Sequence, residues 1–154
     1  MKIGLGFDAH AFDAARPLVL GGVVVPDSPG LAGHSDADVV SHALGDALLG
    51  AANLGDLGGM FPPTEAWRDA SSLEILASSA AAARDAGWKL VNADVTVIAE
   101  RPRLGPYRSE MAARVAEALG ADPASISVKA TTADGLGFTG RGEGIAALAV
   151  VLLE

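Results

Sequence analysis

The sequence predicts an α/β (α+β) fold, in which helices pack on one face of a mixed β-sheet. Three observations support this prediction. Strand-like apolar segments stand near both ends of the chain, and segments with helical periodicity lie between them. The predicted order is strand, strand, helix, helix, strand, helix, strand, strand. The length of 154 residues suits a single domain covering residues 1–154.

The first half of the chain is predicted to form two strands and one helix, followed by a loop. Residues 2–9 and 17–26 have strand composition and could pair antiparallel, with Gly21 and Gly22 marking a bulge or bend. A helix is predicted from Ser35 or Asp36 to Asn53, because its apolar residues repeat at intervals of three and four. The Gly- and Pro-rich segment that follows predicts a loop over residues 54–70.

The second half is predicted to alternate helices with strands. One helix runs from Ser71 or Ser72 to Ala86, and another begins at Pro106 and ends at Leu119. Strands are predicted over residues 89–100, 125–130 and 145–153. The last of these is apolar on both faces, so either helices of the same chain or another copy of the protein must cover its second face.

Composition excludes several classes of function. The chain has no cysteine, so any metal must be held by histidine and carboxylate side chains. A formal net charge of −8 argues against nucleic-acid binding and leaves metal ions and backbone N–H groups to hold an anionic substrate. No apolar run is long enough to span a bilayer, and the first residues do not resemble a signal peptide. We expect a cytoplasmic protein.

All three histidines lie in two aspartate-rich segments, GFDAH and GHSDADVVSH. Asp8 and His10 point to the same face of an extended segment, and His42 lies one turn into the predicted helix. One Asp and two His would leave an open position on a tetrahedral zinc, as in catalytic sites. Asp38 and Asp46 share the helical stripe of His42 and could hold its second ring nitrogen. The alternatives are a surface Asp beside a hydrogen-bonded His, and a solvated helix face.

Two further segments could bind phosphate groups. His34 and Ser35 could form a turn and an N-cap, or they could stand beside free N–H groups of a helix N-terminus. In KATTADGLGFTGRGEG, Thr131 and Thr132 follow a strand, and five glycines allow close backbone approach to a ligand. Asp134 in this segment is a plausible Mg²⁺ ligand. The alternative is a plain glycine-rich connector.

Taken together, GFDAHAF, GHSDADVVSHALGDALLGAANLGDLGGMFPP and KATTADGLGFTGRGEGIA resemble the 2-C-methyl-D-erythritol 2,4-cyclodiphosphate synthases of the non-mevalonate isoprenoid pathway. The resemblance covers essentially the whole chain. It implies a homotrimer with active sites between neighbouring subunits. In the implied reaction, the 2-phosphate of 4-diphosphocytidyl-2-C-methyl-D-erythritol 2-phosphate attacks the β-phosphorus, and CMP leaves.

The resemblance also implies residue roles. The catalytic set is Asp8, His10, His34, His42 and Thr132, with Zn²⁺ or another divalent cation held by Asp8, His10 and His42. Mg²⁺ or Mn²⁺ at the diphosphate is implied for Asp134, which is one methylene shorter than the family's usual glutamate. The implied substrate-binding residues are Ser35, Asp56, Gly58, Phe61, Ala99, Pro102, Arg103, Leu104, Ala130, Thr131, Thr132, Phe138 and Arg141. Within this set the resemblance assigns the cytidine pocket to Ala99, Pro102, Arg103, Leu104, Ala130, Thr131 and Thr132. Arg141 would face a cavity on the three-fold axis that can hold isoprenoid diphosphates.

Two other functions compete with the cyclase. One is a zinc-dependent phosphoesterase, in which the open metal position activates water. The other is a non-catalytic trimer that binds prenyl diphosphates through Arg141. The segment from Phe61 to Ser72 also departs from the family, because FPPTE stands where the family often has FPDTD and Ser71 stands where it has an aspartate.

Overall fold

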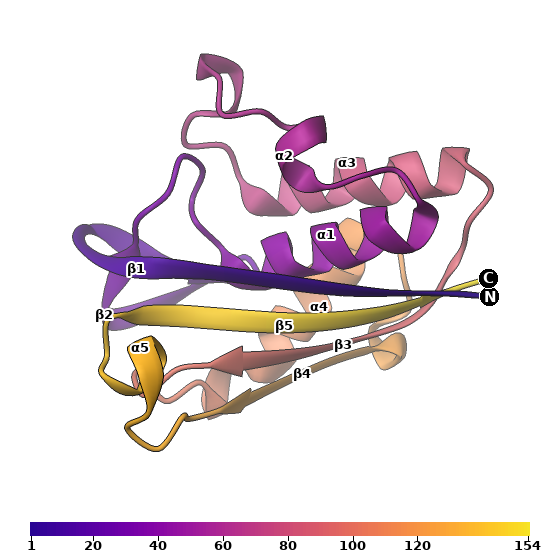
Figure 1. The fold of residues 1–154 in the computed structure, drawn as a ribbon. Helices are drawn as coiled ribbons and strands as arrows, with labels where there is room; N and C mark the ends of the chain where they lie inside the picture. The colour runs from indigo at the N-terminus through magenta and orange to yellow at the C-terminus, as the bar shows by residue number, and fades with distance from the viewer.

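Five strands form one mixed sheet in the computed structural model, which describes residues 1–154 apart from the side chain of Ala66. The strand order is β2-β1-β5-β3-β4, and β3 pairs with β4 in parallel while the other neighbours are antiparallel. Lys2 pairs with Leu153, so the two termini lie side by side at one end of the sheet (Figure 1). The strands are β1 (Lys2–Leu20), β2 (Val23–Leu31), β3 (Leu90–Ile98), β4 (Ile126–Thr131) and β5 (Gly144–Leu153).

The longer helices pack on one face of this sheet, as predicted (Figure 1). They are α1 (Val39–Ala52), α3 (Ser72–Asp85) and α4 (Arg108–Leu119), and the short helices are α2 (Leu57–Met60) and α5 (Gly137–Gly140). Helix α1 starts three to four residues later than predicted, because Asp38 rather than Ser35 or Asp36 is its N-cap. Pro106 lies in the 3-10 turn Gly105–Tyr107 that precedes α4, not in the α-helix itself. In the described part of the chain, no helix is long and apolar enough to cross a membrane.

The prediction that the first strand ends at residue 9 and a second begins at residue 17 is wrong. Strand β1 continues without a break to Leu20, because Phe12 and Asp13 pair with residues of β2. Gly21 and Gly22 have φ angles of 55° and 72° and form the two-residue turn between β1 and β2 instead of a bulge. A two-residue hairpin turn with positive φ at both positions favours glycine strongly. The ladder irregularity lies near Pro17, where the pairing register shifts.

Two glycines of β1 allow α1 to lie directly on the strand. A β-carbon on Gly4 would come within 1.8 Å of the Ala47 carbonyl oxygen, and one on Gly6 within 1.9 Å of the Ala43 carbonyl oxygen. Only glycine permits backbones to approach this closely. The contact brings the middle of β1 next to the first turn of α1, which is where the predicted metal ligands lie.

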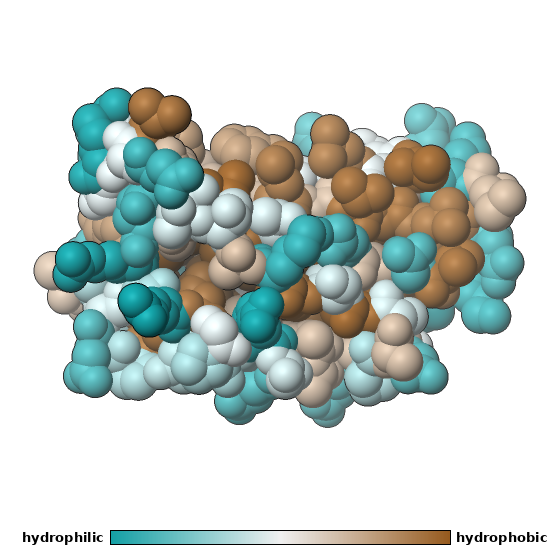
Figure 2. Space-filling view, turned by 90° about the horizontal axis from the view of Figure 1, so that it is seen from below, coloured by the Kyte–Doolittle hydropathy of each residue, from teal (hydrophilic) through white to brown (hydrophobic). Residues whose placement is uncertain are grey.

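The other face of the sheet remains apolar and exposed. Ile3, Leu5 and Phe7 of β1 and Leu148 and Val150 of β5 are between 39% and 75% exposed. Leu5 pairs with Val150 and Phe7 with Leu148, so these side chains form one continuous surface. Figure 2 shows apolar residues gathered toward the end of the molecule that carries the termini. The described residues of the same chain leave this surface uncovered, and an exposed apolar patch of this kind typically marks an interface.

Candidate active site

The three predicted metal ligands meet where β1 passes the first turn of α1. The Asp8 carboxylate oxygen Oδ2 lies 3.0 Å from His10 Nε2 and 3.0 Å from His42 Nδ1. The three ligand atoms lie within 4.8 Å of one another, and all three side chains are partly buried. The strand places Asp8 and His10 on one face, and the helix supplies His42, as the sequence predicted.

This arrangement fits a divalent cation. His10 Nε2 is buried and makes no hydrogen bond in the described part of the structure, although it lies near the Asp8 carboxylate. A buried nitrogen without a partner is costly, and a metal ion would satisfy it. One carboxylate and two imidazoles are a donor set that zinc uses in catalytic sites, with a fourth position open to substrate.

The pKa values of Asp8 and His42 are shifted from their ordinary values. Burial raises the pKa of Asp8, but the close His10 and His42 imidazoles and their positive charges outweigh burial and bring the pKa to about 2. Burial lowers the pKa of His42, but the hydrogen bond to Asp8 and the nearby carboxylate charges outweigh it and leave the pKa above 6.5. The metal-free cluster therefore holds a negative charge on Asp8 and binds a proton on His42 more tightly than usual, and a cation would displace that proton.

The second ring nitrogen of His42 faces two serine hydroxyls. His42 Nε2 lies 2.9 Å from Ser72 Oγ and 3.1 Å from Ser35 Oγ. Ser72 is fully buried at the start of α3, and its hydroxyl donates a hydrogen bond to the Asp36 carboxylate. From the sequence, Ser72 is predicted only to start a helix, because no local pattern indicates that α3 meets α1 at this point.

Asp38 does not hold the ring of His42, which corrects one of the expectations for that residue. Its carboxylate is fully buried and accepts hydrogen bonds from the backbone N–H groups of Gly21, Gly22, Val40 and Ser41 and from the Ser41 hydroxyl. Burial and the charge of Asp36 raise its pKa against these bonds. The carboxylate thus fixes the β1–β2 turn to the N-terminus of α1.

The same capping also corrects the idea that α1 presents free N–H groups to a phosphate. The N–H groups of Val40 and Ser41 are bonded to Asp38. The Ala37 N–H donates to the Ser35 hydroxyl, and the Asp38 N–H donates to Asp36. Phosphate binding near His34 and Ser35 would therefore depend on side chains and a metal, not on the end of this helix.

A cavity of about 250 Å³ opens beside the metal ligands. Of the predicted site residues, Asp8, His10, His34, Ser35, His42, Gly58 and Phe61 line it. His34 Nε2 donates to the Thr64 carbonyl oxygen at 2.7 Å, which ties the ring to the segment after α2. Asp56 does not line this cavity and instead caps α2 by accepting from the Gly59 N–H.

The lining also includes Asp46 in a role that the sequence did not indicate, and Trp67, which the sequence did not indicate at all. Asp46 lines the cavity and accepts a hydrogen bond from the Leu57 N–H at 2.8 Å, so it is neither a partner of His42 nor a solvated helix residue. Trp67 packs edge-on against Phe61, with ring centroids 4.9 Å apart. These two aromatic rings close one wall of the cavity. A lone tryptophan in an aperiodic loop gives no such signal in the sequence.

All seven residues expected to hold cytidine line a second cavity, of about 480 Å³. They are Ala99, Pro102, Arg103, Leu104, Ala130, Thr131 and Thr132. Thr132 donates a hydrogen bond to Asp134 at 3.0 Å, and Asp134 is exposed and stands apart from the Asp8 cluster. Glu100, which no sequence motif indicates, lines the same cavity, and its carboxylate accepts a hydrogen bond from the Ala133 N–H.

Arg141 lines a third cavity, of about 470 Å³, together with Phe12 and Arg101. Its guanidinium donates to the Glu143 carboxylate at 2.7 Å, and this pair keeps the pKa of Glu143 below its ordinary value. Phe138 is 41% exposed and lies outside the three cavities that hold predicted residues.

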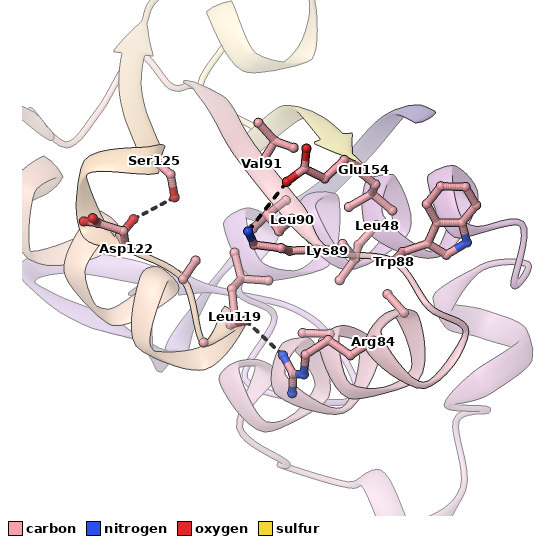
Figure 3. A pocket seen from close by; sticks show the side chains of 15 residues that line it. Leu48, Arg84, Trp88, Lys89, Leu90, Val91, Leu119, Asp122, Ser125 and Glu154 are labelled. Atoms are coloured by element: carbon pink, nitrogen blue, oxygen red, sulfur yellow. Dashed lines mark hydrogen bonds and ion pairs between the residues drawn. The ribbon is translucent and has the colours of Figure 1, made fainter. Parts of the chain in front are cut away.

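Another cavity, of about 360 Å³, lies between the ends of α3 and α4 and is drawn in Figure 3. Its polar groups engage one another: Lys89 pairs with Glu154, and Arg84 donates to the Leu119 carbonyl oxygen. Its lining contains none of the three histidines. The predicted metal ligands therefore line the smaller cavity beside Asp8 and not this larger one.

Sequence comparison places the whole chain in one group. The sequence model of the YgbB family matches residues 1–154. A 2-C-methyl-D-erythritol 2,4-cyclodiphosphate synthase of Moorella thermoacetica is 57% identical over 154 residues, which is 99% of this chain and 94% of that protein. A synthase of the same name from Geobacillus kaustophilus is 55% identical over 154 residues, which is 99% of this chain and 98% of that protein.

Solved structures agree with this match. A bifunctional IspDF from Campylobacter jejuni superposes with a TM-score of 0.95 at 44% identity, over 99% of this chain and 42% of that one. A 2C-methyl-D-erythritol-2,4-cyclodiphosphate synthase described as a bound form with CDP has a TM-score of 0.90 at 35% identity, over 99% of both chains. A Plasmodium falciparum IspF in complex with CDP has a TM-score of 0.85 at 30% identity, over 99% of this chain and 94% of that one.

Proposed function

The chain belongs to the YgbB family and is an enzyme that makes 2-C-methyl-D-erythritol 2,4-cyclodiphosphate for isoprenoid synthesis, and we propose that it does so from 4-diphosphocytidyl-2-C-methyl-D-erythritol 2-phosphate with release of CMP. The observation that carries the proposal is the convergence of Asp8, His10 and His42 in a cavity, in a chain that matches the synthases along its whole length. CDP in the related structures supports a cytidine nucleotide as the substrate class.

The metal would be held by Asp8, His10 and His42, and zinc suits this donor set. When bound there, a divalent cation supplies neutralisation and orientation of diphosphate oxygens. Ser35 and His34 line the same cavity and would contact the phosphate groups. Asp134 and Thr132, which are hydrogen-bonded to each other beside the nucleotide cavity, would serve Mg²⁺ or Mn²⁺ and the diphosphate from the cytidine side.

The residues of the chain then act by positioning. Attacking phosphate and target phosphorus belong to one molecule, so holding that molecule folded converts the reaction into a favourable intramolecular step. Gly58 and Asp56 at the start of α2 would hold the erythritol part, and Ala99, Arg103 and Leu104 would bind the cytidine. No protein nucleophile is needed, which agrees with the absence of cysteine from the sequence.

We further propose that the active enzyme is a homotrimer. The metal cavity and the cytidine cavity of one chain share no lining residue, so a neighbouring subunit would bring the two halves of a site together. The exposed surface made by Ile3, Leu5, Phe7, Leu148 and Val150 would be buried between the subunits. Arg141 would then face the axis, where an isoprenoid diphosphate could bind.

The direct test is to incubate the protein with the cytidylyl substrate and Mg²⁺ and to follow CMP together with the cyclic diphosphate. In water labelled with ¹⁸O, a cyclase leaves the label out of its product, whereas the rival phosphoesterase puts it into a linear phosphate. Failure to release CMP would favour the rival prenyl-diphosphate binder. His42→Ala should lose zinc and turnover while the oligomer persists, and retained activity would contradict the ligand assignment.

Mixed oligomers test whether the site is shared. His42→Ala removes the metal half, and Ala130→Trp fills the cytidine half at an exposed position of β4. Each variant alone should be inactive. Random mixing should restore about a quarter of the wild-type activity, because about one interface in four pairs two intact halves. No recovery on mixing, with oligomer exchange shown independently, would place both halves in one subunit.

A further inference from the structure

Arg16 extends from an irregular stretch of β1 toward the loop that precedes α1. Between Asp13 and Pro17, β1 advances four residues while its partner strand β2 advances only one. Inside this stretch, the Asp13 carboxylate accepts a hydrogen bond from the Ala15 N–H at 2.9 Å. An irregularity of this kind bends a strand and re-aims its side chains. The Arg16 side chain therefore reaches the neighbouring loop, and only 21% of it is exposed.

The Arg16 guanidinium holds the backbone on both sides of His34. Nη1 donates to the Gly33 carbonyl oxygen, and Nη2 donates to the Ser35 carbonyl oxygen. The carbonyl oxygen between them, that of His34, accepts from the Asp69 N–H at 2.9 Å. All three carbonyl groups of this segment are therefore engaged, and one side chain takes two of them.

These two carbonyl bonds matter more than the ion pair that Arg16 also makes. Arg16 Nη2 lies 3.6 Å from Asp69 Oδ1, but the Asp69 side chain is 78% exposed. An ion pair exposed to this degree contributes little. Hydrogen bonds from a charged donor are stronger, and the planar guanidinium is rigid enough to fix the spacing of two acceptors. Arg16 thus fixes the path of the backbone through His34.

The segment held in this way forms part of the wall of the metal cavity. The His34 and Ser35 side chains line that cavity. The same backbone is bonded to the loop that carries Trp67, because the Asp36 N–H donates to the Ala70 carbonyl oxygen at 3.2 Å. Trp67 lines the cavity as well. A shift of the two carbonyl groups held by the guanidinium would therefore move several groups of this wall together.

We propose that Arg16 is a positioning residue that holds the carbonyl groups on both sides of His34 and so presets His34 and Ser35 for the phosphate groups of the substrate. The inference rests on the proposed function, in which His34 and Ser35 contact those groups. Arg16 itself does not line the metal cavity, so it acts through the backbone. A misplacement of about 1 Å at a reacting group can cost on the order of a hundredfold in rate.

Arg16→Ala tests the proposal through kinetics and chemical rescue. We expect kcat to fall on the order of a hundredfold with little change in KM, because the metal ligands and the cytidine cavity remain in place. Methylguanidinium at a non-denaturing concentration should restore part of the activity, whereas methylammonium should not, because only a planar fork spans two acceptors. A cavity of about 250 Å³ beside Arg16, lined also by Asp36 and Asp69, gives the added cation a way in.

Two further variants separate positioning from stability. Arg16→Lys keeps the charge without the fork, so it should be nearly as slow as Arg16→Ala, and it serves as the test if the truncation lowers stability. Arg84→Ala is the matched control, since Arg84 also donates to a backbone carbonyl oxygen, that of Leu119 at 3.1 Å, but lies away from the metal cavity. It should keep the wild-type kcat. Full activity of Arg16→Lys, a loss confined to KM, or equal rescue by both cations would refute the proposal.

A second measurement needs neither metal nor substrate. Trp88→Phe leaves Trp67 as the only tryptophan, because the chain has two. In that background, Arg16→Ala should make Trp67 more accessible to quenching by acrylamide, whereas Arg84→Ala should not. Unchanged quenching in the Arg16 variant would overturn the proposal. The expected quenching, together with a wild type that releases no CMP, would count against the proposed function alone.

Discussion

Replacing Gly6 by alanine should disturb stability and metal binding together. A β-carbon at this position would lie 1.9 Å from the Ala43 carbonyl oxygen and 2.7 Å from the Ala47 nitrogen. Real β-carbon contacts essentially never fall below 3.0 Å, so β1 and α1 must separate by about 1 Å. Ala43 follows His42 directly and Gly6 stands two residues before Asp8, so the separation passes straight to the metal ligands.

The expected size follows from this displacement. Overpacking of a closely fitted core costs about 1 to 3 kcal/mol. For a chain of this length, about 2 kcal/mol lowers the melting temperature by roughly 4 to 8 °C. A misplacement of about 1 Å at a reacting group can cost on the order of a hundredfold in rate. We therefore expect Gly6→Ala to lower the melting temperature, to weaken zinc binding and to reduce kcat well beyond the loss of folded protein.

Gly50→Ala is the matched control. Gly50 lies in α1, and a β-carbon there would meet nothing within 4 Å. Alanine in an exposed helix position should stabilise the protein by about 1 kcal/mol. The assays are thermal unfolding of the metal-free protein, zinc competition with a chelator, and steady-state kinetics. If Gly6→Ala matched the wild type in melting temperature and zinc affinity, the close approach of β1 and α1 would not position the ligands as argued.

Three further perturbations address the cap, the cluster and the sheet surface. Asp38→Asn should lower the free energy of unfolding by about 3 kcal/mol in denaturant titrations, because an amide cannot accept all five hydrogen bonds that the carboxylate accepts. Asp122→Asn, at an exposed cap, is the control and should cost little. Equal effects of the two variants would contradict the role of burial. The affinity for zinc, measured calorimetrically, should fall as the pH drops below the pKa of His42, because zinc must then displace the proton on that ring. For this one proton the expected fall is about tenfold for each pH unit. That pKa lies above 6.5, and Asp8, with a pKa of about 2, stays ionised and does not compete, so a pH-independent affinity near neutrality would refute the assignment. Leu5→Asp should yield monomers in analytical ultracentrifugation without loss of secondary structure, while Leu54→Asp on the helix side should not; an intact oligomer in the first variant would exclude this surface as the interface.

The metal ligands could be predicted because each rests on local periodicity. Residues two apart on a strand share a face, which related Asp8 to His10, and helical spacing placed His42 on one stripe with Asp38 and Asp46 without deciding whether that stripe faces inward. The direction of the Asp38 side chain could not be predicted. Spacing of four residues is compatible both with contact to His42 and with capping, and the β1–β2 turn that supplies two of its donors is brought there only by the fold.

The remaining differences arise from contacts distant in sequence. Ser72 reaches His42 across 30 residues, and no local pattern encodes that meeting of two helices. The continuity of β1 past Ala9 depends on its partner strand, which supplies hydrogen bonds through a stretch whose composition indicates a break. Glycines 4 and 6 are informative only once α1 is known to lie over them.

The adjacency of the first and last residues has a practical consequence. Lys2 is paired with Leu153, and Asp8 lies six residue steps, or about 20 Å, further along β1. Extra polypeptide attached at either terminus would project from the end of the sheet that lies away from the Asp8 cluster. A fused second enzyme, as in the bifunctional relatives of which this chain covers about two fifths, can therefore be accommodated without any redesign of the cavity. For the same reason, a short peptide joining Met1 to Glu154 would allow the chain to be opened elsewhere as a circular permutant.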